Sequence, residues 1–288
     1  MVTADLDVRR ALANALDQPV VDISPLGGGC VSAVYGARLG DGRRVVAKVD
    51  ETGEAGLPVE AAMLRYLAER TALPVPAVHI VTQQLLVLAY VEGDSLFDDN
   101  AERHAAELLA ELHALTAPTF GFERDTLIGG LRQPNPAHDS WLTFFAEQRL
   151  VYMAVEARRA GRLPAALLAR VERLAGRVER WLREPAQPSL IHGDVWTTNV
   201  LARGGRITAF LDPAVYYAHA EMELAFIGLF GTFGRVFYDA YRARRPIASG
   251  FFEERRDLYN LYPLLVHVRL FGGSYVGQVE RVLTRFGC

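Results

Sequence analysis

Cysteine is scarce in this sequence, which contains only Cys30 and Cys288 among its 288 residues. Two cysteines cannot form the disulfide framework of a small secreted domain, and neither belongs to a Cys-x-x-Cys pair or a Cys/His cluster that would bind zinc. Long apolar runs are also absent, and none approaches the roughly 20 residues of a membrane helix. The first ten residues lack the apolar core of a signal peptide. We therefore expect a cytoplasmic protein without a membrane partner.

An excess of charge of either sign is missing too. The sequence has 31 Lys and Arg against 34 Asp and Glu, for a net charge of -3. A protein that binds nucleic acid would concentrate basic residues, so we expect no nucleic-acid partner. What remains is an ordinary globular composition, 50% hydrophobic and 23% charged, in a chain long enough for two lobes.

A group of polar residues stands out in the second half of the chain. His192, Asp194 and Asn199 follow the apolar residues 190 and 191, and Asp212 follows the apolar run 207–211. An Asp, then an Asn, then an Asp after a short hairpin is the order in which protein-kinase-type phosphotransferases place a proton acceptor and two magnesium ligands. The pattern predicts Asp194 as the catalytic residue, Asn199 and Asp212 as ligands of Mg²⁺, and ATP as the phosphoryl donor.

The first part of the chain contains a candidate phosphate-binding turn. Gly27, Gly28 and Gly29 lie between two predicted strands, residues 20–24 and 31–38. Glycine lets backbone N–H groups approach a phosphate without a side chain in the way, but tight hairpins also collect glycine. The triplet alone does not distinguish the two.

A lysine and a glutamate favour the phosphate interpretation. Lys48 lies in the predicted strand 43–50, and Glu60 lies in the first turn of a helix predicted to begin near Pro58. A strand lysine can also reach water at a sheet edge, and an early helical acid can also stabilise the helix dipole. In a kinase, Lys48 would bind the ATP phosphates and Glu60 would hold its ammonium group in place.

The fold expected is a mixed α/β (α+β), bilobal, protein-kinase-like fold. Residues 1–91 form a small nucleotide-binding lobe with an antiparallel sheet, which ends after two strands at 77–81 and 85–90. Residues 92–288 form a larger, mainly helical lobe for catalysis and substrate binding, with helices at 101–115, 141–149 and 163–181. The non-helical segment 120–136 is long for a loop and is predicted to face the substrate. Arginines of the later helices, Arg149 among them, are expected on a solvent-exposed face.

These residues resemble the aminoglycoside phosphotransferase and choline kinase group. The narrower resemblance is to the fructosamine kinase (ketosamine-3-kinase) family, because Trp196 follows the His-Gly-Asp-Val sequence directly and Asp212 begins the run Asp-Pro-Ala-Val-Tyr-Tyr. The Phe-Gly-Phe sequence at 120–122 and the spacing of Trp141, Phe144 and Phe145 are also similar to that family. Ala89, where an acid is typical, and the Thr pair at 197 and 198 depart from its pattern.

The resemblance implies that ATP and Mg²⁺ serve to phosphorylate the 3-hydroxyl group of a ketosamine, the adduct of a sugar with an amine, in the repair of glycated amines or proteins. It assigns Asp194 to proton transfer and Trp196 to a platform for the sugar. The implied contacts fall into four groups: phosphates at Gly27, Gly28, Gly29, Lys48 and Glu60; adenine at the backbone of Leu88, Ala89 and Tyr90; Mg²⁺ at Asn199 and Asp212; substrate at Trp196, Gln133 and Asn135.

Cys30 directly follows the glycine triplet. In some members of the family, a cysteine in this loop resembles a redox switch that links two protomers through a disulfide. The alternative for Cys30 is a small buried residue without such a role. A monomer and a homodimer are both compatible with the sequence.

Two other functions compete with a ketosamine kinase. One is a kinase for another small alcohol, such as an aminoglycoside, a choline-like amine or a free sugar. The other is a non-catalytic nucleotide-binding protein, which would not need Asp194, Asn199, Asp212, Lys48 and Glu60 together.

Overall fold

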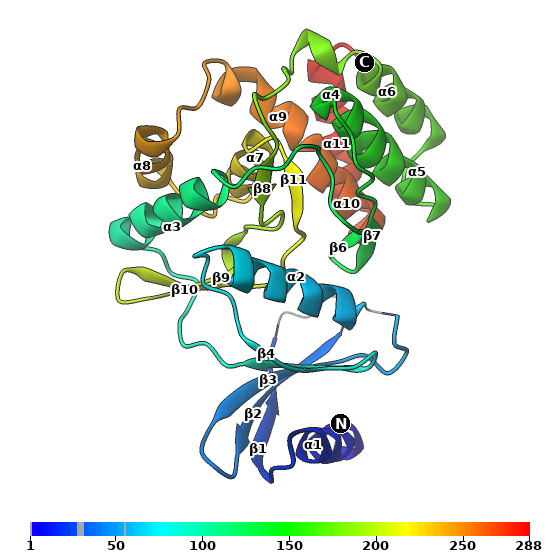
Figure 1. The fold of residues 1–288 in the computed structure, drawn as a ribbon. Coiled ribbons are helices and arrows are strands. Elements are labelled where there is room, and N and C mark those ends of the chain that lie inside the picture. Colours follow the sequence, from blue (N-terminus) through cyan, green and yellow to red (C-terminus); the bar gives the residue numbers. More distant parts are fainter. Residues whose placement is uncertain (1, 28–31, 55) are drawn as a thin grey trace. The chain divides into compact units, whose positions relative to one another are not determined.

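The computed structural model describes residues 2–27, 32–54 and 56–288, so Gly28, Gly29 and Cys30 lie outside the described residues (Figure 1). It divides into two compact units that are described one at a time. Unit 1 contains Met1–Ala101 and Thr198–Pro213, and unit 2 contains Glu102–Thr197 and Ala214–Cys288.

Unit 1 is built on an antiparallel five-stranded sheet with the order β1-β2-β3-β5-β4. This sheet and the helical content of unit 2 confirm the predicted fold class, and its strands begin and end close to the predicted residues. The elements are β1 (Val20–Pro25), β2 (Ala33–Leu39), β3 (Arg44–Val49), β4 (Val78–Val81) and β5 (Leu85–Ala89), with helices α1 (Val2–Leu16) and α2 (Leu57–Arg70).

Each face of the sheet is covered by one helix, which follows from the alternation of side chains along β3. Val45 and Ala47 belong to a buried cluster with residues of α1, whereas Val46 packs against the cluster that contains residues of α2. Since side chains alternate between faces with a period of two, Lys48 shares the α2 side with Val46. The alternation therefore directs this lysine toward the helix that carries Glu60.

A hairpin from late in the chain belongs to unit 1. Its strands are β9 (Val200–Arg203) and β10 (Arg206–Phe210). The N–H of Asp94 donates to the carbonyl of Ala202 at 3.0 Å, the N–H of Ala202 donates back at 2.8 Å, and the N–H of Phe210 donates to Pro74 at 2.8 Å. These bonds explain why the compact unit differs from the contiguous division at residue 91 expected from sequence.

Unit 2 is mainly helical and carries two short antiparallel ladders, β8 with β11 and β6 with β7. Helix α10 packs against α5 and α11. Helix α3 (Asp99–Leu112) leads into this unit, and the 3₁₀ turn η3 (Thr197–Asn199) leads out of it. The remaining elements are β6 (Thr126–Ile128), β7 (Leu131–Gln133), α4 (Trp141–Phe144), η1 (Phe145–Val151), α5 (Tyr152–Arg159), α6 (Ala165–Ala175), η2 (Val178–Arg180), β8 (Ser189–Ile191), β11 (Tyr216–Ala218), α7 (Glu221–Leu229), α8 (Arg235–Arg244), η4 (Phe251–Arg255), α9 (Arg256–Tyr259), α10 (Leu261–Phe271) and α11 (Ser274–Arg285).

Arg149 does not lie on a solvent-exposed face, so that expectation is wrong. It sits in the π-helical segment η1 and is fully buried. Its guanidinium group lies 3.9 Å from the ring centre of Tyr216 and donates to the Pro134 carbonyl at 2.8 Å and to Asn135 Oδ1 at 2.5 Å. Aromatic faces and oxygen acceptors replace water around this cation, which is why an arginine can be buried here.

None of the helices within the described residues combines the length and the apolar character needed to cross a lipid bilayer.

Candidate active site

Lys48 is the centre of a charge cluster in unit 1. Its Nζ lies 2.7 Å from Glu60 Oε1 and 2.5 Å from Asp212 Oδ1, and its side chain is only 10% exposed. Burial opposes the ammonium charge, but the carboxylates of Asp212 and Glu60 outweigh it and raise the pKa of the Lys48 amine. The lysine is therefore a permanent cation, and the predicted pairing of Lys48 with Glu60 is present.

Asn199 and Asp212 lie at the same end of the β9–β10 hairpin. Asn199 immediately precedes β9, Asp212 follows β10, and the N–H of Leu211 donates to the Asn199 carbonyl at 2.8 Å. Asp212 has a left-handed backbone with φ 52°, a conformation that costs free energy in most non-glycine residues and often occurs at functional positions. Asn199 is buried, whereas the Asp212 side chain is 45% exposed.

The donor set fits a magnesium ion that is shared with phosphates. Within the described residues, no group of three or more His, Cys, Asp or Glu side chains could hold a metal by itself. Magnesium bound together with nucleotide phosphates commonly takes only one or two protein oxygens, and Asn199 and Asp212 supply two.

The segment at the end of β5, predicted to bind adenine through its backbone, offers fewer free N–H donors than the sequence led us to expect. The N–H of Ala89 donates to the Ala77 carbonyl at 2.8 Å, and the N–H of Tyr90 donates to Arg44 at 3.3 Å. Leu88 is buried within β5 and pairs with Val46. Contacts of Ala89 and Tyr90 with adenine would therefore use their carbonyl groups.

Gly27 is the one member of the glycine triplet that the structure describes. A Cβ atom built on it would meet no atom of the described residues within 4 Å, apart from its chain neighbours. This observation does not distinguish the phosphate-binding interpretation from the tight hairpin.

Asp194 lies in unit 2, on the loop that follows β8. The preceding Gly193 has φ 87°, and a Cβ atom there would lie 2.2 Å from the Ala214 carbonyl oxygen, so only glycine fits without displacing the backbone. The N–H of Asp194 donates to His192 Nδ1 at 3.3 Å, and the N–H of Ala214 donates to the His192 carbonyl at 2.8 Å. His192 thus braces the loop that presents the half-buried Asp194.

A mainly apolar pocket adjoins Asp194 within unit 2. Its walls come from the β8 loop, α7 and α10, and they include Met222, Phe226, Val266 and His267. Burial lowers the pKa of His267, although a hydrogen bond with the Pro263 carbonyl opposes the shift, so this imidazole is uncharged at neutral pH. The acidic residues of its lining are Asp194 and Glu223, and the Glu223 side chain is fully buried.

Trp196 is partly buried beside the same loop. Its ring centre lies 5.9 Å from that of Phe230, and Phe230 lies 5.1 Å from His267. We call Trp196, Phe230 and His267 the aromatic wall. It joins the tryptophan predicted to contact the sugar to a residue that lines the pocket.

Gln133 and Asn135, predicted as substrate contacts, are buried and bonded to other protein groups. Gln133 Nε2 donates to Thr126 Oγ1 at 2.9 Å and to the Ala214 carbonyl at 3.1 Å, while Tyr262 donates to Gln133 Oε1 at 2.7 Å. Asn135 Nδ2 donates to Thr126 Oγ1 at 2.8 Å. Their amides tie together the segments around the pocket, and Tyr262 is the neighbour of Gln133 that lines it.

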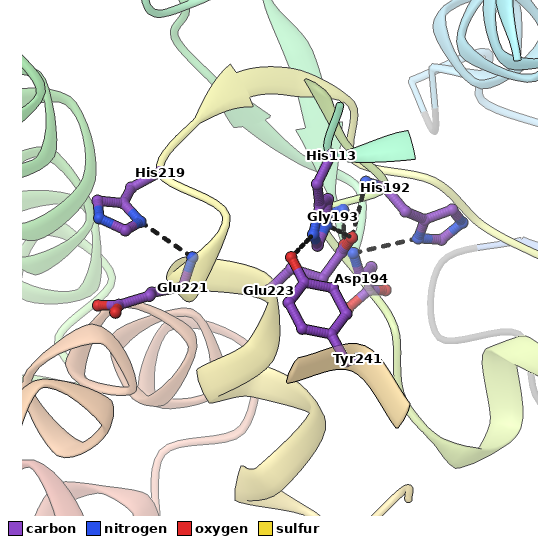
Figure 2. A network of polar contacts seen from close by, with 8 residues as sticks. All are labelled: His113, His192, Gly193, Asp194, His219, Glu221, Glu223 and Tyr241. Atoms are coloured by element: carbon purple, nitrogen blue, oxygen red, sulfur yellow. Dashed lines mark hydrogen bonds and ion pairs between the residues drawn. The ribbon is translucent and has the colours of Figure 1, made fainter. Parts of the chain in front are cut away.

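Sequence reasoning missed the group that supports the loop carrying Asp194. The N–H of Gly193 donates to Glu223 Oε1 at 2.6 Å, and His113 Nε2 lies 2.8 Å from Glu223 Oε2 (Figure 2). His113 had no role assigned from sequence. The two carboxylates of the apolar helix 221–229, Glu221 and Glu223, were the signal that could have indicated the group, because a buried charge needs partners.

Comparisons with known proteins bear on the whole chain. A family model described as fructosamine kinase matches residues 5–286. A probable ketoamine kinase of Synechocystis sp. is 36% identical over 266 residues, which make up 89% of this chain and 87% of that protein. A chloroplastic protein-ribulosamine 3-kinase of Arabidopsis thaliana is 31% identical, over 92% of this chain and 82% of that protein.

Solved structures agree with these relatives. A Thermobifida fusca crystal structure assigned as a fructosamine-3-kinase is 30% identical, with a TM-score of 0.84 over 96% of this chain and 98% of that one. An aminoglycoside phosphotransferase, at 18% identity and a TM-score of 0.67 over 98% of this chain and 99% of that one, shares the fold. The predicted phosphotransferase fold is thereby confirmed, and the chain belongs to the fructosamine kinase family.

Proposed function

We propose that this protein transfers the γ-phosphoryl group of ATP to the 3-hydroxyl group of a ketosamine. The observation that carries the proposal is the placement of Asp194, a partly exposed carboxylate, in an otherwise mainly apolar pocket of a fructosamine kinase family member. Relatives named as ketoamine kinases and as a ribulosamine 3-kinase support the same acceptor class.

The reaction assigns Asp194 to the acceptor. The oxygen of the 3-hydroxyl group forms a bond to the γ-phosphorus, and the bond from that phosphorus to the bridging oxygen of ADP breaks. Asp194 accepts the proton that leaves the hydroxyl group and orients the hydroxyl for attack. Gly193 and His192 fix the backbone from which this carboxylate extends.

Lys48 acts on the donor. Its buried ammonium group binds phosphate oxygens, and Glu60 keeps it directed along the α2 side of the sheet. Asn199 and Asp212 would hold Mg²⁺, which when bound neutralises charge on the phosphates.

The aromatic wall suits a sugar carried on an amine. Trp196 presents an aromatic face, against which the C–H groups of a sugar can pack, and its ring centre lies 5.9 Å from that of Phe230, to which it is tilted. His267 is uncharged at neutral pH, so it does not repel an ammonium group on the substrate. We place the sugar between Asp194 and this wall.

ATP turnover against a panel of acceptors tests the proposal. The panel contains a fructosamine, a ribulosamine, an aminoglycoside, choline and a free sugar. We expect ADP release with the first two, and a product whose phosphate is assigned to carbon 3 by ³¹P and ¹³C NMR. Turnover restricted to the last three acceptors would overturn the proposal in favour of a different small-alcohol kinase, and ATP binding without any turnover would favour a nucleotide-binding protein.

A further inference from the structure

Glu223 is a carboxylate without access to solvent beneath the catalytic loop. Its side chain and that of His113 are both 0% exposed. Glu223 Oε1 accepts the N–H of Gly193 at 2.6 Å, and Oε2 lies 3.3 Å from the N–H of His192 and 2.8 Å from His113 Nε2. Figure 2 shows this carboxylate directed at the two peptide groups that precede Asp194.

The contacts determine which atoms carry protons. Burial by itself would raise the pKa of the Glu223 carboxyl, but its hydrogen bond with His113, its electrostatic interactions with His113 and His192 and the Gly193 N–H together hold that pKa below its ordinary value. An ionised carboxylate can only accept hydrogen bonds. Nε2 of His113 must therefore carry the proton that it shares with Glu223.

Tyr241, on α8, fixes the other side of His113. Its oxygen lies 2.7 Å from His113 Nδ1, and the two rings meet edge to face with centres 5.6 Å apart. Burial raises the pKa of the Tyr241 phenol, which keeps it protonated. The histidine is thus held at both ring nitrogens, by α8 on one side and by the α7 carboxylate on the other.

The loop needs an external acceptor at this point. Gly193 takes φ 87°, so the local backbone does not follow a regular ladder that would pair its N–H. Without Glu223, the N–H of Gly193 would be left without its closest acceptor, and rotation of that peptide would change the direction in which Asp194 leaves the backbone.

We propose that Glu223, together with His113 and Tyr241, is a positioning device that sets the direction of the Asp194 carboxylate. None of the three touches the acceptor through its own reactive group in this scheme. The inference rests on the proposed function only in naming Asp194 as the residue that is positioned; the hold on the Gly193 peptide does not depend on the identity of the acceptor.

The test compares Glu223→Gln with Glu221→Gln. Both glutamates are buried on α7, but Glu221 pairs with Arg255 at 2.6 Å, away from the catalytic loop. A glutamine at 223 offers one acceptor oxygen instead of two. Its NH₂ group would then face an N–H group that Glu223 accepts, unless His113 changed tautomer. For Glu223→Gln we expect kcat to fall at least about tenfold with the KM for ATP within about twofold, and the Gly193 amide to exchange with deuterium at least about tenfold faster.

Glu221→Gln supplies the matched structural control. We expect a lower Tm from loss of the buried ion pair, with kcat and exchange at Gly193 within about twofold of the natural protein. Equal kcat and equal Gly193 exchange in the two variants would overturn the proposal. If the natural protein turned over none of the ketosamines while Glu223→Gln still accelerated exchange at Gly193, the proposed function would fail and the positioning device would stand.

Tyr241→Phe provides a second route in case Glu223→Gln does not fold. It removes one oxygen and leaves the contacts of Glu223 with the loop in place. We expect a kcat a few-fold lower, and a changed ¹⁵N shift of His113 Nδ1 with Nε2 still protonated. A ¹⁵N spectrum of the natural protein with Nε2 unprotonated would contradict the assignment.

Discussion

Asp194 is the residue on which the proposed reaction depends most directly. Asp194→Asn keeps the size of the side chain but removes the proton acceptor, so we expect kcat to fall by about 10²- to 10⁴-fold while the Kd for ATP changes less than about twofold. Steady-state kinetics and ATP titration measure the two quantities. Asp239→Asn is the control, because Asp239 pairs with Arg235 on the surface and its loss should leave kcat unchanged. A variant at position 194 with near-normal kcat would exclude the assigned base.

Trp196 governs the acceptor rather than the nucleotide in this scheme. Trp196→Ala removes the aromatic face that packs on Phe230, and we expect the KM for the ketosamine to rise up to about tenfold with the KM for ATP unchanged. Trp196→Phe should retain part of the affinity. If both KM values rose together, or neither did, Trp196 would be a supporting aromatic residue and not part of the sugar site.

At the level of secondary-structure elements, β3 and α2 act together. The alternation of side chains along β3 and the first turn of α2 bring Lys48 and Glu60 together. Glu60→Gln removes one of the two carboxylates beside Lys48 and leaves Asp212 in place. We expect kcat/KM for ATP to fall about tenfold. Glu69→Gln, at an exposed position near the end of the same helix, should have no effect on it. Equal values for the two variants would show that the ion pair does not position the phosphates.

The start of α7 depends on His219, because protonation of this side chain would remove a hydrogen-bond acceptor that the helix uses. The N–H of Glu221 donates to His219 Nδ1 at 3.0 Å (Figure 2), and burial lowers the pKa of His219 from 6.5 to about 4. As pH falls, His219 binds a proton near pH 6.5 in the unfolded chain but only near pH 4 in the folded chain. Stability from this residue is therefore complete above pH 6.5 and is lost as pH falls to 4, by about 3 kcal/mol at most.

His219→Asn isolates that effect. The asparagine oxygen can accept the same N–H but does not titrate, so the variant should lose less stability than the natural protein between pH 6.5 and 4. Urea denaturation at several pH values measures the difference. Parallel losses in the two proteins would assign the acid sensitivity to other groups.

At the scale of the whole molecule, donor and acceptor groups belong to different compact units. Lys48, Glu60, Asn199 and Asp212 are in unit 1, and Asp194, Trp196 and His267 are in unit 2. Glu60 pairs with Lys48 within unit 1, whereas Trp196 packs against Phe230 within unit 2. The double variant Glu60→Gln/Trp196→Ala should therefore lose the sum of the two single losses in transition-state free energy, to within about 0.5 kcal/mol. A larger deviation in a double-mutant cycle would reveal coupling between the two residues.

The sequence predicted much of this molecule because several of its signals are local. Strand alternation around Lys48, a helix start at Pro58 and the Asp-Asn-Asp order each depend on neighbouring residues. The long-range partners could not be read in this way. The burial of Arg149 depends on Tyr216, the support of Gly193 depends on Glu223 and His113, and the membership of the β9–β10 hairpin in unit 1 depends on Pro74 and Asp94. Each of these contacts joins residues far apart in the chain, which composition and spacing do not encode.

The late hairpin has an evolutionary consequence. Because Asn199 and Asp212 belong to unit 1 through their own short ladder, the residues that we assign to phosphates and metal form one inheritable module. Pocket walls from α7 and α10 can then change by mutation without disturbing that module. A lineage can diversify its acceptors while the phosphate chemistry stays fixed, so laboratory evolution toward a new alcohol should accumulate substitutions in unit 2.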